Sequence, residues 1–317
     1  MPFISYQECL RRLREERAAG RPLIGAGAGT GISAKFAEAG GVDIVIIYNS
    51  GRYRMAGRGS SAGLMPYGDA NAIVQEMAGE VLPIVKDTPV LAGVCGTDPF
   101  RFMKVFLKQL KEMGFDGVQN FPTVGVIDGN FRQILEETGM SYDLEVEMIR
   151  TAHEMDMLTC PYVFDEEQAV KMTEAGADLI VTHMNTTVAG SVGVDPGTAP
   201  SLDEAVERIG RMRDAARSVN PDVFVICHGG PIAYPEDVQY ILDRTEGIDG
   251  FFGASSIERL PTEVAIENQG PLTGTAVLMT DPIPAGTTYV PGSASNGATY
   301  NSSLNQIEWT GTVGRIW

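Results

Sequence analysis

Four segments of this chain share one pattern, in which a helical stretch ends in glycine and is followed by one residue, an aspartate and a short apolar strand. The aspartates are Asp43, Asp116, Asp178 and Asp249. A further apolar strand candidate precedes each of them along the chain: PLIGAGAG, PVLAGVCG, LTCPYVF and DVFVICHGG. The sequence therefore alternates eight short strands with helical stretches such as SLDEAVERIGRMRDAARS.

Strands that are apolar throughout indicate a parallel sheet that is buried on both faces. Eight strand–helix units in about 250 residues are typical of the (β/α)8 TIM barrel. We therefore predict an α/β fold with such a barrel in residues 1–268. The repeated Gly-x-Asp then has a structural interpretation, since glycine ends the helix in the left-handed conformation and aspartate fixes the turn into the strand.

The stretch LIGAGAGTGIS, residues 23–33, is the first predicted strand and the loop after it. Its spacing, G-x-G-x-G-x-G, departs from the dinucleotide fingerprint G-x-G-x-x-G, and it lacks the Gly-Lys-Ser/Thr of a phosphate loop. It instead enters the barrel face where active sites form. Gly25 and Gly27 either let backbone amides approach a substrate or let the chain turn tightly.

Composition narrows the classes of partner. The net charge is −17 and the pI about 4.6, which disfavours nucleic acid and anionic membrane surfaces. No apolar run approaches the roughly 20 residues of a membrane span. The charged N-terminus is unlike a signal peptide, so we expect a cytoplasmic protein. The cysteines lack CxxC spacing, which predicts reduced thiols and no zinc site.

A long loop rich in glycine and arginine follows the second strand, NSGRYRMAGRGSSAGLMPYGDAN. Such a loop is typical of a lid or binding loop, the alternative being a solvated surface loop. Arg52, Arg54 and Arg58 could clamp a carboxylate or phosphate, and we assign Arg52 and Arg58 to closing over the anion. Asn49 and Ser50, at the start of the loop, are expected to contact the substrate.

Candidate catalytic residues follow other strands. Cys95 and Asp98 come after the third strand, although Asp98 could equally be a helix N-cap. His183 and His228 end the sixth and seventh strands, where barrel enzymes keep acid–base groups, and the alternative for each is a buried, satisfied histidine. No lysine stands at a strand end, so no Schiff base is expected.

The remaining substrate-binding candidates are neutral. Gln119 and Asn120 end the fourth strand. The loops HGGPI and GASSIERLP follow the last two strands, where barrels commonly bind phosphate. We expect the anion to be held there by Gly229, Gly230, Gly253, Ser255 and Ser256. A capping box between Ser255 and Glu258 is a local interpretation of the same residues.

The chain closely resembles the phosphoenolpyruvate hydrolase-like TIM-barrel family over about residues 3–266. The resemblance rests on GAGAGTGISAKFAEAGGVDIVIIYNSGRYRMAGRGS, VLAGVCGTDPF, GVQNFPTVGVIDGNFR, LEETGMSYDLEVEMI and FFGASSIERLPTE. Members are also described as phosphonopyruvate hydrolases or TIM-barrel signal-transduction proteins. The resemblance implies a barrel enzyme acting on a small phosphorylated or phosphono C3 carboxylic acid.

The wider superfamily also implies a cofactor, Mg²⁺. Its Ser-Gly after the second strand is matched by Ser50 and Gly51. Its magnesium-holding acids, an Asp-x-Asp after the third strand and an acid after the fourth, correspond here to Cys95 with neutral neighbours and to Gln119–Asn120. Losing these oxygen anions weakens a magnesium site, so we assign no metal ligand.

The composition changes after residue 268. Residues 269–317 are rich in Thr, Ser and Gly, with period-two patterning and Pro or Asn-Gly turns, which predicts a short all-β fragment. This fragment resembles part of a bacterial surface-protein β-sandwich repeat. It holds about half a repeat, so we do not expect an independent domain.

Three functions are compatible with these patterns. We favour hydrolysis of the C3 acid to pyruvate and phosphate by a homo-oligomer that takes a small anionic substrate. A non-catalytic anion-binding or signal-transduction barrel and a carbon–carbon lyase on a related acid remain open.

Overall fold

The structure is a computed structural model that describes residues 4–190, 192–258, 274–282, 299–301, 303 and 306–313. The chain divides into two compact units, Met1–Thr262 and Glu263–Trp317. Each unit is described by itself.

The first unit is built on one parallel sheet. Its strands are β1 (Leu23–Gly27), β2 (Ile44–Ile47), β3 (Val90–Gly93), β4 (Gly117–Gln119), β5 (Leu158–Thr159), β6 (Tyr162–Val163), β7 (Leu179–His183), β8 (Phe224–His228) and β9 (Gly250–Gly253). They are ordered β5-β4-β3-β2-β1-β9-β8-β7-β6.

The segment of β5 and β6 closes this sheet. Both strands belong to one extended stretch that is interrupted at Cys160 and Pro161. β5 pairs with β4, and β6 pairs with β7. The sheet therefore returns on itself through eight strand positions, which confirms the predicted (β/α)8 barrel.

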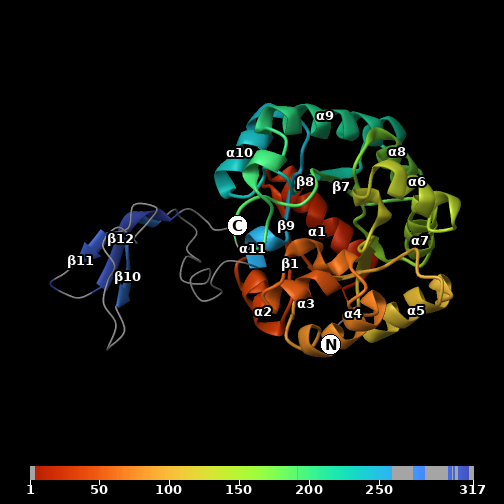
Figure 1. The fold of residues 1–317 in the computed structure, drawn as a ribbon, viewed down its shortest axis with the longest axis horizontal. Coiled ribbons are helices and arrows are strands. Elements are labelled where there is room, and N and C mark those ends of the chain that lie inside the picture. Colours follow the sequence, from red (N-terminus) through yellow and green to blue (C-terminus); the bar gives the residue numbers. More distant parts are fainter. Residues whose placement is uncertain are drawn as a thin grey trace. The chain divides into compact units, whose positions relative to one another are not determined.

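Helices lie around the strands (Figure 1). The α-helices are α1 (Tyr6–Ala18), α2 (Gly31–Ala39), α3 (Asn49–Met55), α4 (Ala70–Val81), α5 (Met103–Met113), α6 (Gly129–Glu137), α7 (Tyr142–Glu154), α8 (Glu166–Glu174), α9 (Leu202–Val219), α10 (Pro235–Arg244) and α11 (Ser255–Glu258). Short 3-10 helices are η1 (Ser60–Leu64), η2 (Val124–Val126) and η3 (Pro196–Thr198). Among the described residues, none of the helices is both long and apolar enough to span a bilayer.

Helix α9 illustrates how the sequence sets these elements. Ser201 and Glu204 form a reciprocal capping box that satisfies two backbone N–H groups at its N-terminus. Its buried residues, Ala205, Ile209, Met212 and Ala216, recur at helical spacing and pack toward the barrel.

The four repeated aspartates fix the entry of the strands. Each carboxylate accepts a hydrogen bond from a backbone N–H at the start of the preceding strand, and we call this contact a carboxylate clamp. The pairs are Asp43–Ile24 at 2.7 Å, Asp116–Val90 at 2.9 Å, Asp178–Thr159 at 2.9 Å and Asp249–Val225 at 2.7 Å. The glycines two residues earlier, Gly41, Gly114, Gly176 and Gly247, all have positive φ. The structural interpretation of Gly-x-Asp is therefore confirmed.

The second unit contains an antiparallel sheet. Strands β10 (Gly274–Pro282), β11 (Thr299–Asn301) and β12 (Gln306–Val313) are ordered β10-β12-β11. The predicted β character of this region is confirmed in these strands, although the unit begins a few residues before the predicted boundary at 268/269. Its likeness to a surface-protein repeat, and its inability to fold alone, stay predictions.

Candidate active site

A cavity of about 50 Å³ lies at the carboxyl ends of the barrel strands. Its walls include Tyr48 after β2, Phe121 after β4, Tyr162 in β6, His183 at the end of β7 and His228 at the end of β8. This is the end of a barrel where active sites form.

Aromatic rings make most of this wall. The Tyr162 ring stacks on the His228 ring with centroids 5.3 Å apart, and the His183 ring meets it edge-on at 4.6 Å. The two histidine rings lie 4.5 Å apart at 86°. The structure therefore brings together the two predicted histidines, which are separated by 45 positions in the sequence.

His228 has a defined protonation state. Its Nδ1 lies 2.6 Å from the carbonyl oxygen of Phe252. A carbonyl oxygen only accepts, so Nδ1 carries the proton and Nε2 keeps a lone pair. The pKa of His228 is lowered to about 4, mainly by burial and to a smaller extent by Arg54, against the opposing effect of the Phe252 hydrogen bond. His228 is therefore a neutral hydrogen acceptor at pH 7.

His183 is also neutral but is less constrained. Burial, and then the neighbouring His228, lower its pKa well below the usual value. Its Nδ1 is buried and has no hydrogen-bond partner among the described residues. The alternative interpretation of a satisfied core histidine does not fit, because buried polar atoms are normally paired.

One arginine lies in the cavity wall, and it is Arg54. Its side chain is 4% exposed and its Nε forms an ion pair with Glu258, whose side chain is 1% exposed. Arg54 also donates from Nη2 to the Tyr48 hydroxyl at 3.2 Å. Burial lowers the pKa of Arg54, but the opposing effects of Glu258 and Tyr48 are larger, so the guanidinium stays charged.

The loop after β2, residues 49–71, contributes Arg54, Ser60, Ser61 and Leu64 to the cavity wall, and we call it the cover. Its role as a binding loop stays a prediction. It is mostly helical, because α3 and η1 occupy it. Asn49 donates from Nδ2 to the Gly63 carbonyl at 2.9 Å, and Ser50 donates to the Ser60 carbonyl at 3.0 Å. These two residues therefore hold the cover in place, and Ser60 and Leu64 line the cavity.

Arg52 and Arg58, the two arginines assigned to closing over the anion, are not among the residues that line the cavity. Arg52 pairs with Glu80 of α4 at 3.1 Å, and both side chains are well exposed. Arg58 is exposed. Arg54 lies four residues after Ser50, on the buried face of α3, and this helical spacing is the signal that singles it out.

The glycines pack closely instead of opening a backbone surface. A Cβ on Gly25 would lie 2.7 Å from the Phe252 ring, and one on Gly27 would lie 3.0 Å from the Ala254 backbone. A Cβ on Gly253 would lie 2.6 Å from Ile257. Tight packing is thus the interpretation that the contacts favour for these three glycines.

The HGG turn and the GASS turn differ in the hydrogen-bond donors that they could present to an anion. Gly229 and Gly230 have positive φ, and the N–H of Gly230 donates to the Asn185 carbonyl at 2.9 Å. Ser255 lines the cavity, and the hydroxyl of Ser256 is buried without a partner among the described residues. The serines are the better placed of these residues for an anion.

The proposed capping box of Ser255 and Glu258 is wrong. Glu258 gives one oxygen to Arg54, and its other oxygen has no partner in the described part of the chain. The buried guanidinium is a stronger partner for the carboxylate than a helix-end amide.

Cys95 and Asp98 are not among the residues that line the cavity. Burial raises the pKa of the Cys95 thiol, which disfavours the thiolate nucleophile. Asp98 pairs with Arg101 and accepts a hydrogen bond from Asn71 at 2.9 Å, and it is not the N-cap of α5, a position held by Phe102.

Gln119 and Asn120 are buried beside the cavity. Gln119 donates to the Cys160 carbonyl at 3.1 Å, and Asn120 accepts from the Tyr162 N–H at 2.7 Å. Both side chains are therefore used to hold the interrupted fifth strand. Sequence reasoning missed Tyr48, Tyr162 and the Arg54–Glu258 pair.

The residues do not fit a magnesium site. Within the described ranges, no group of three His, Cys, Asp or Glu side chains is placed to hold a metal ion. The carboxylates nearest the cavity are engaged, Glu258 by Arg54 and Glu145 by three hydrogen bonds. Hard cations need free oxygen ligands, so the reaction proposed below uses no Mg²⁺.

Comparisons with known proteins agree with the barrel. Residues 8–271 match the phosphoenolpyruvate hydrolase-like family, and the chain belongs to that family. Two proteins of Solanum lycopersicum, named ToMV susceptible protein tm-1(GCR26) and ToMV resistance protein Tm-1(GCR237), are 64% and 63% identical over 257 residues. These matches cover 81% of this chain but 34% of each relative, so the chain spans about a third of their length.

The solved structures show the fold alone. A crystal structure of oxaloacetate acetylhydrolase is similar with a TM-score of 0.53 at 16% identity, and the match covers 84% of this chain and 86% of that chain.

Proposed function

We propose that this member of the phosphoenolpyruvate hydrolase-like family is an enzyme that hydrolyses a small phosphorylated or phosphono C3 carboxylic acid to pyruvate and phosphate, without a divalent metal. The observation that carries the proposal is His228, a neutral histidine with a fixed tautomer in the wall of the cavity. Its Nε2 makes no hydrogen bond within the described residues and is available to accept a proton.

The reaction on phosphonopyruvate needs one water and one base. Water adds its oxygen to phosphorus, the carbon–phosphorus bond breaks, and the pyruvate enolate takes a proton at carbon 3. His228 Nε2 accepts the proton from the attacking water. A base with a pKa of about 4 is weak, but it is unprotonated at every pH above that value.

Arg54 supports binding of the substrate carboxylate. Nε and Nη2 are engaged by Glu258 and Tyr48, whereas Nη1 makes no hydrogen bond to the described residues. A guanidinium offers five N–H donors, so this nitrogen can donate to a carboxylate. The hydroxyl of Ser60, which lines the cavity and has no partner among the described residues, would donate to the second anionic group.

The cover must move for the substrate to enter. A cavity of about 50 Å³ holds a few water molecules, which is less than a C3 acid with a phosphonate needs. Within the cover, Asn49 and Ser50 hold η1 against α3. The Ser60 N–H, which donates to the Val192 carbonyl at 3.0 Å, and the Arg54–Glu258 pair join the cover to the rest of the barrel. Opening of a short covering segment is common in barrel enzymes.

The test is phosphate release from phosphoenolpyruvate and phosphonopyruvate, measured with Mg²⁺ and with excess EDTA. We expect release that EDTA leaves unchanged and that His228→Gln lowers about 10²- to 10⁴-fold. His153→Gln is the matched control, because that histidine lies on α7 and contacts Tyr6. Failure of both substrates to release phosphate at any Mg²⁺ concentration overturns the proposal.

A carbon–carbon lyase is the second candidate, favoured by the charge of the cavity wall. Arg54, the cation that the described residues supply to this wall, is already paired with Glu258, which suits a dicarboxylate better than phosphonopyruvate, whose phosphonate adds more negative charge. Pyruvate formation from oxaloacetate, without phosphate release from phosphonopyruvate, would select this function.

A non-catalytic barrel is the third candidate. It predicts a ligand that stabilises the protein in a thermal-shift screen of small anions but is never converted. Replacing His183 and His228 together by Gln would then leave binding nearly intact.

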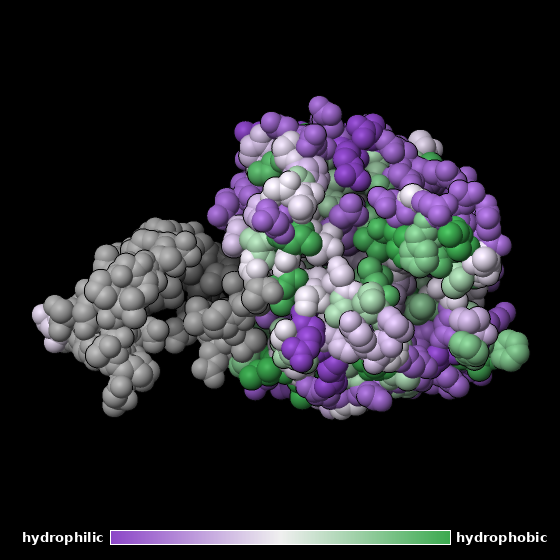
Figure 2. Space-filling view, in the orientation of Figure 1, coloured by the Kyte–Doolittle hydropathy of each residue, from purple (hydrophilic) through white to green (hydrophobic). Residues whose placement is uncertain are grey.

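A homo-oligomer is also part of the proposal. Apolar side chains gather over α6 and α7 on the surface in Figure 2. They include Phe131, which is 60% exposed, with Ile134, Met140 and Leu144. Light scattering on the purified protein measures whether a second copy covers them.

A further inference from the structure

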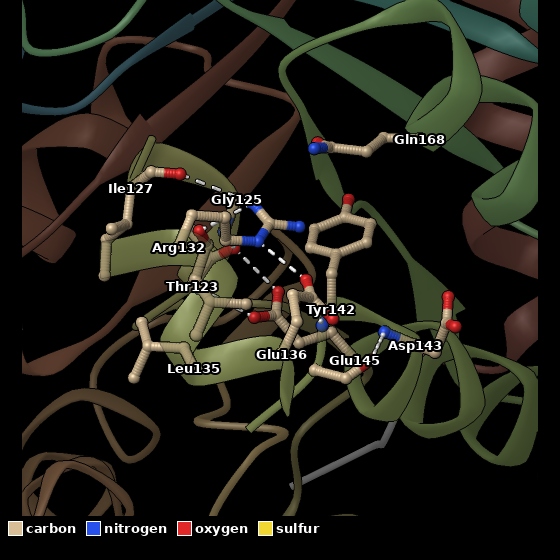
Figure 3. A network of polar contacts seen from close by, with 12 residues as sticks. Thr123, Gly125, Ile127, Arg132, Leu135, Glu136, Tyr142, Asp143, Glu145 and Gln168 are labelled. Carbon is tan, nitrogen blue, oxygen red and sulfur yellow. Dashed lines mark hydrogen bonds and ion pairs between the residues drawn. The ribbon is translucent and has the colours of Figure 1, made fainter. Parts of the chain in front are cut away.

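Glu145 is a fully buried acid on α7, next to the cavity wall but outside it. Its carboxylate accepts hydrogen bonds from Asn120 Nδ2 at 2.7 Å, from the Thr123 hydroxyl at 2.7 Å and from the Val124 N–H at 2.8 Å. All three donors belong to the segment that follows β4. Figure 3 shows Glu145 and Thr123 within a polar network that also contains Arg132, Glu136 and Tyr142.

The carboxylate determines how Asn120 is oriented. A carboxylate only accepts hydrogen bonds, so the amide nitrogen of Asn120 must face it. The amide oxygen of Asn120 then faces the other way and accepts from the Tyr162 N–H at 2.7 Å. An apolar or donating neighbour in place of Glu145 would remove this preference.

The backbone of Tyr162 depends on these side chains. The fifth strand is interrupted at Cys160 and Pro161, so side chains supply hydrogen bonds there in addition to the strand pairing. Asn120 holds the Tyr162 N–H, and the Tyr142 hydroxyl donates to the Tyr162 carbonyl at 2.7 Å. Tyr142 and Glu145 lie one turn apart on α7, so one helix holds this residue both directly and through Asn120.

The ring of Tyr162 carries this constraint to the histidines. It stacks on His228 at an interplanar angle of 15° and meets His183 edge-on. We propose that Glu145 is a positioning residue for the histidine pair, acting through Asn120 and Tyr162. Asn120, predicted to bind substrate, then has a positioning role. The inference deepens the proposed function, on which the catalytic use of the pair rests.

Other charged and titratable groups near Glu145 are few. Arg132 of α6 and Tyr142 of α7 interact with it electrostatically, and Cys95 faces it from the loop after β3. Burial raises the pKa of Glu145 to about 7 against the opposing effect of its three hydrogen bonds. The contacts that orient Asn120 favour the charged form, whereas burial, the larger effect, favours the neutral acid.

The test uses Glu145→Gln and reads the histidines directly. A glutamine amide offers one accepting oxygen and one donating nitrogen to three donors, so at least one donor loses its partner. Histidine-selective ¹⁵N and ¹³C NMR of the full chain reports the tautomer and the pKa of His228 without any substrate. We expect a shift of about half a pKa unit or more, or a mixture of tautomers.

Asp116→Asn is the matched control. Asp116 is also a buried acid with a pKa raised by burial, to about 6, and it accepts from two backbone N–H groups. It lies in a carboxylate clamp at the opposite end of the barrel. We expect this variant to lose stability while the His228 signals stay as in the wild type.

A second variant keeps the inference testable if Glu145→Gln does not fold. Tyr142→Phe removes the hydrogen bond to the Tyr162 carbonyl and the interaction of the hydroxyl with Asn120, and it should move the His228 signals in the same direction, by less. Wild-type histidine signals in both folded variants overturn the inference.

If the wild type releases product, Glu145→Gln should also lower kcat about tenfold with little change in KM. If the wild type has no activity, the proposed function fails, but the NMR comparison still decides the role of Glu145.

Discussion

The buried ion pair of Arg54 and Glu258 should dominate the stability of the active-site end of the barrel. Replacing Glu258 by Gln leaves a guanidinium that is almost fully buried and whose close partners, the glutamine amide and the Tyr48 hydroxyl, are both neutral. Removing one partner of such a pair costs about 3–5 kcal/mol. This is a large share of the roughly 5–15 kcal/mol of a whole domain.

The two partners should respond differently to pH. In Arg54→Met, the stranded Glu258 can take up a proton, because burial favours the neutral carboxylic acid. Taking up that proton removes the uncompensated buried charge, so the variant should be more stable at about pH 5 than at about pH 8. Glu258→Gln cannot recover in this way, because a guanidinium does not lose its proton.

Urea unfolding followed by circular dichroism at both pH values measures these effects. The double variant, Arg54→Met with Glu258→Gln, should be less destabilised than the sum of the single variants, with a coupling of about 2 kcal/mol or more. Arg52→Met is the control, since its exposed pair with Glu80 should contribute about 1 kcal/mol or less. A loss below about 1 kcal/mol in Glu258→Gln refutes the reasoning.

Three further predictions follow from single groups. His228 has a folded-state pKa of about 4, which is below its unfolded value. Its contribution to stability is therefore complete above about pH 6.5 and falls by roughly 3 kcal/mol as the pH drops toward about 4. Urea titrations across this range should show a pH dependence of the unfolding free energy that His228→Gln reduces. Asp43→Ala should cost about 1–3 kcal/mol in the same assay, because the Ile24 N–H loses its carboxylate partner, and a neutral result would contradict the role of the clamps. Gly25→Ala should cost about 1–3 kcal/mol by overpacking against Phe252, whereas Gly79→Ala, in open space on α4, should stabilise by up to about 1 kcal/mol.

The barrel could be predicted because its information is local. The spacing of Gly-x-Asp and the unbroken apolar strands each follow from neighbours in the chain, and the structure has the clamps and the positive φ values that this spacing requires. The interruption at Cys160 and Pro161 within the fifth strand was not expected, and it explains why side chains gather around Tyr162.

The site could be predicted only in outline. The positions of His183 and His228 could be predicted because a residue at the carboxyl end of a barrel strand lies at the cavity whatever conformation the loops adopt. The choice among Arg52, Arg54 and Arg58 depends on which face of α3 packs against the barrel, and loop composition carries no such information. The role of Glu145 is set by tertiary contacts with Asn120, far away in the chain, so no local pattern could mark it.

The carboxylate clamps place the residues that set strand register at one end of the barrel and leave the cavity-lining residues at the other. Each clamp joins the entries of two strands at the end of the barrel away from the cavity, through contacts such as Asp249 to the Val225 N–H. Strand register is therefore anchored at the end of the barrel opposite the candidate active site. Residues at the carboxyl ends whose side chains make no contact with a neighbouring strand can therefore be exchanged while the strands keep their alignment. A protein engineer could use this barrel as a scaffold, redesigning its mouth and leaving its base untouched.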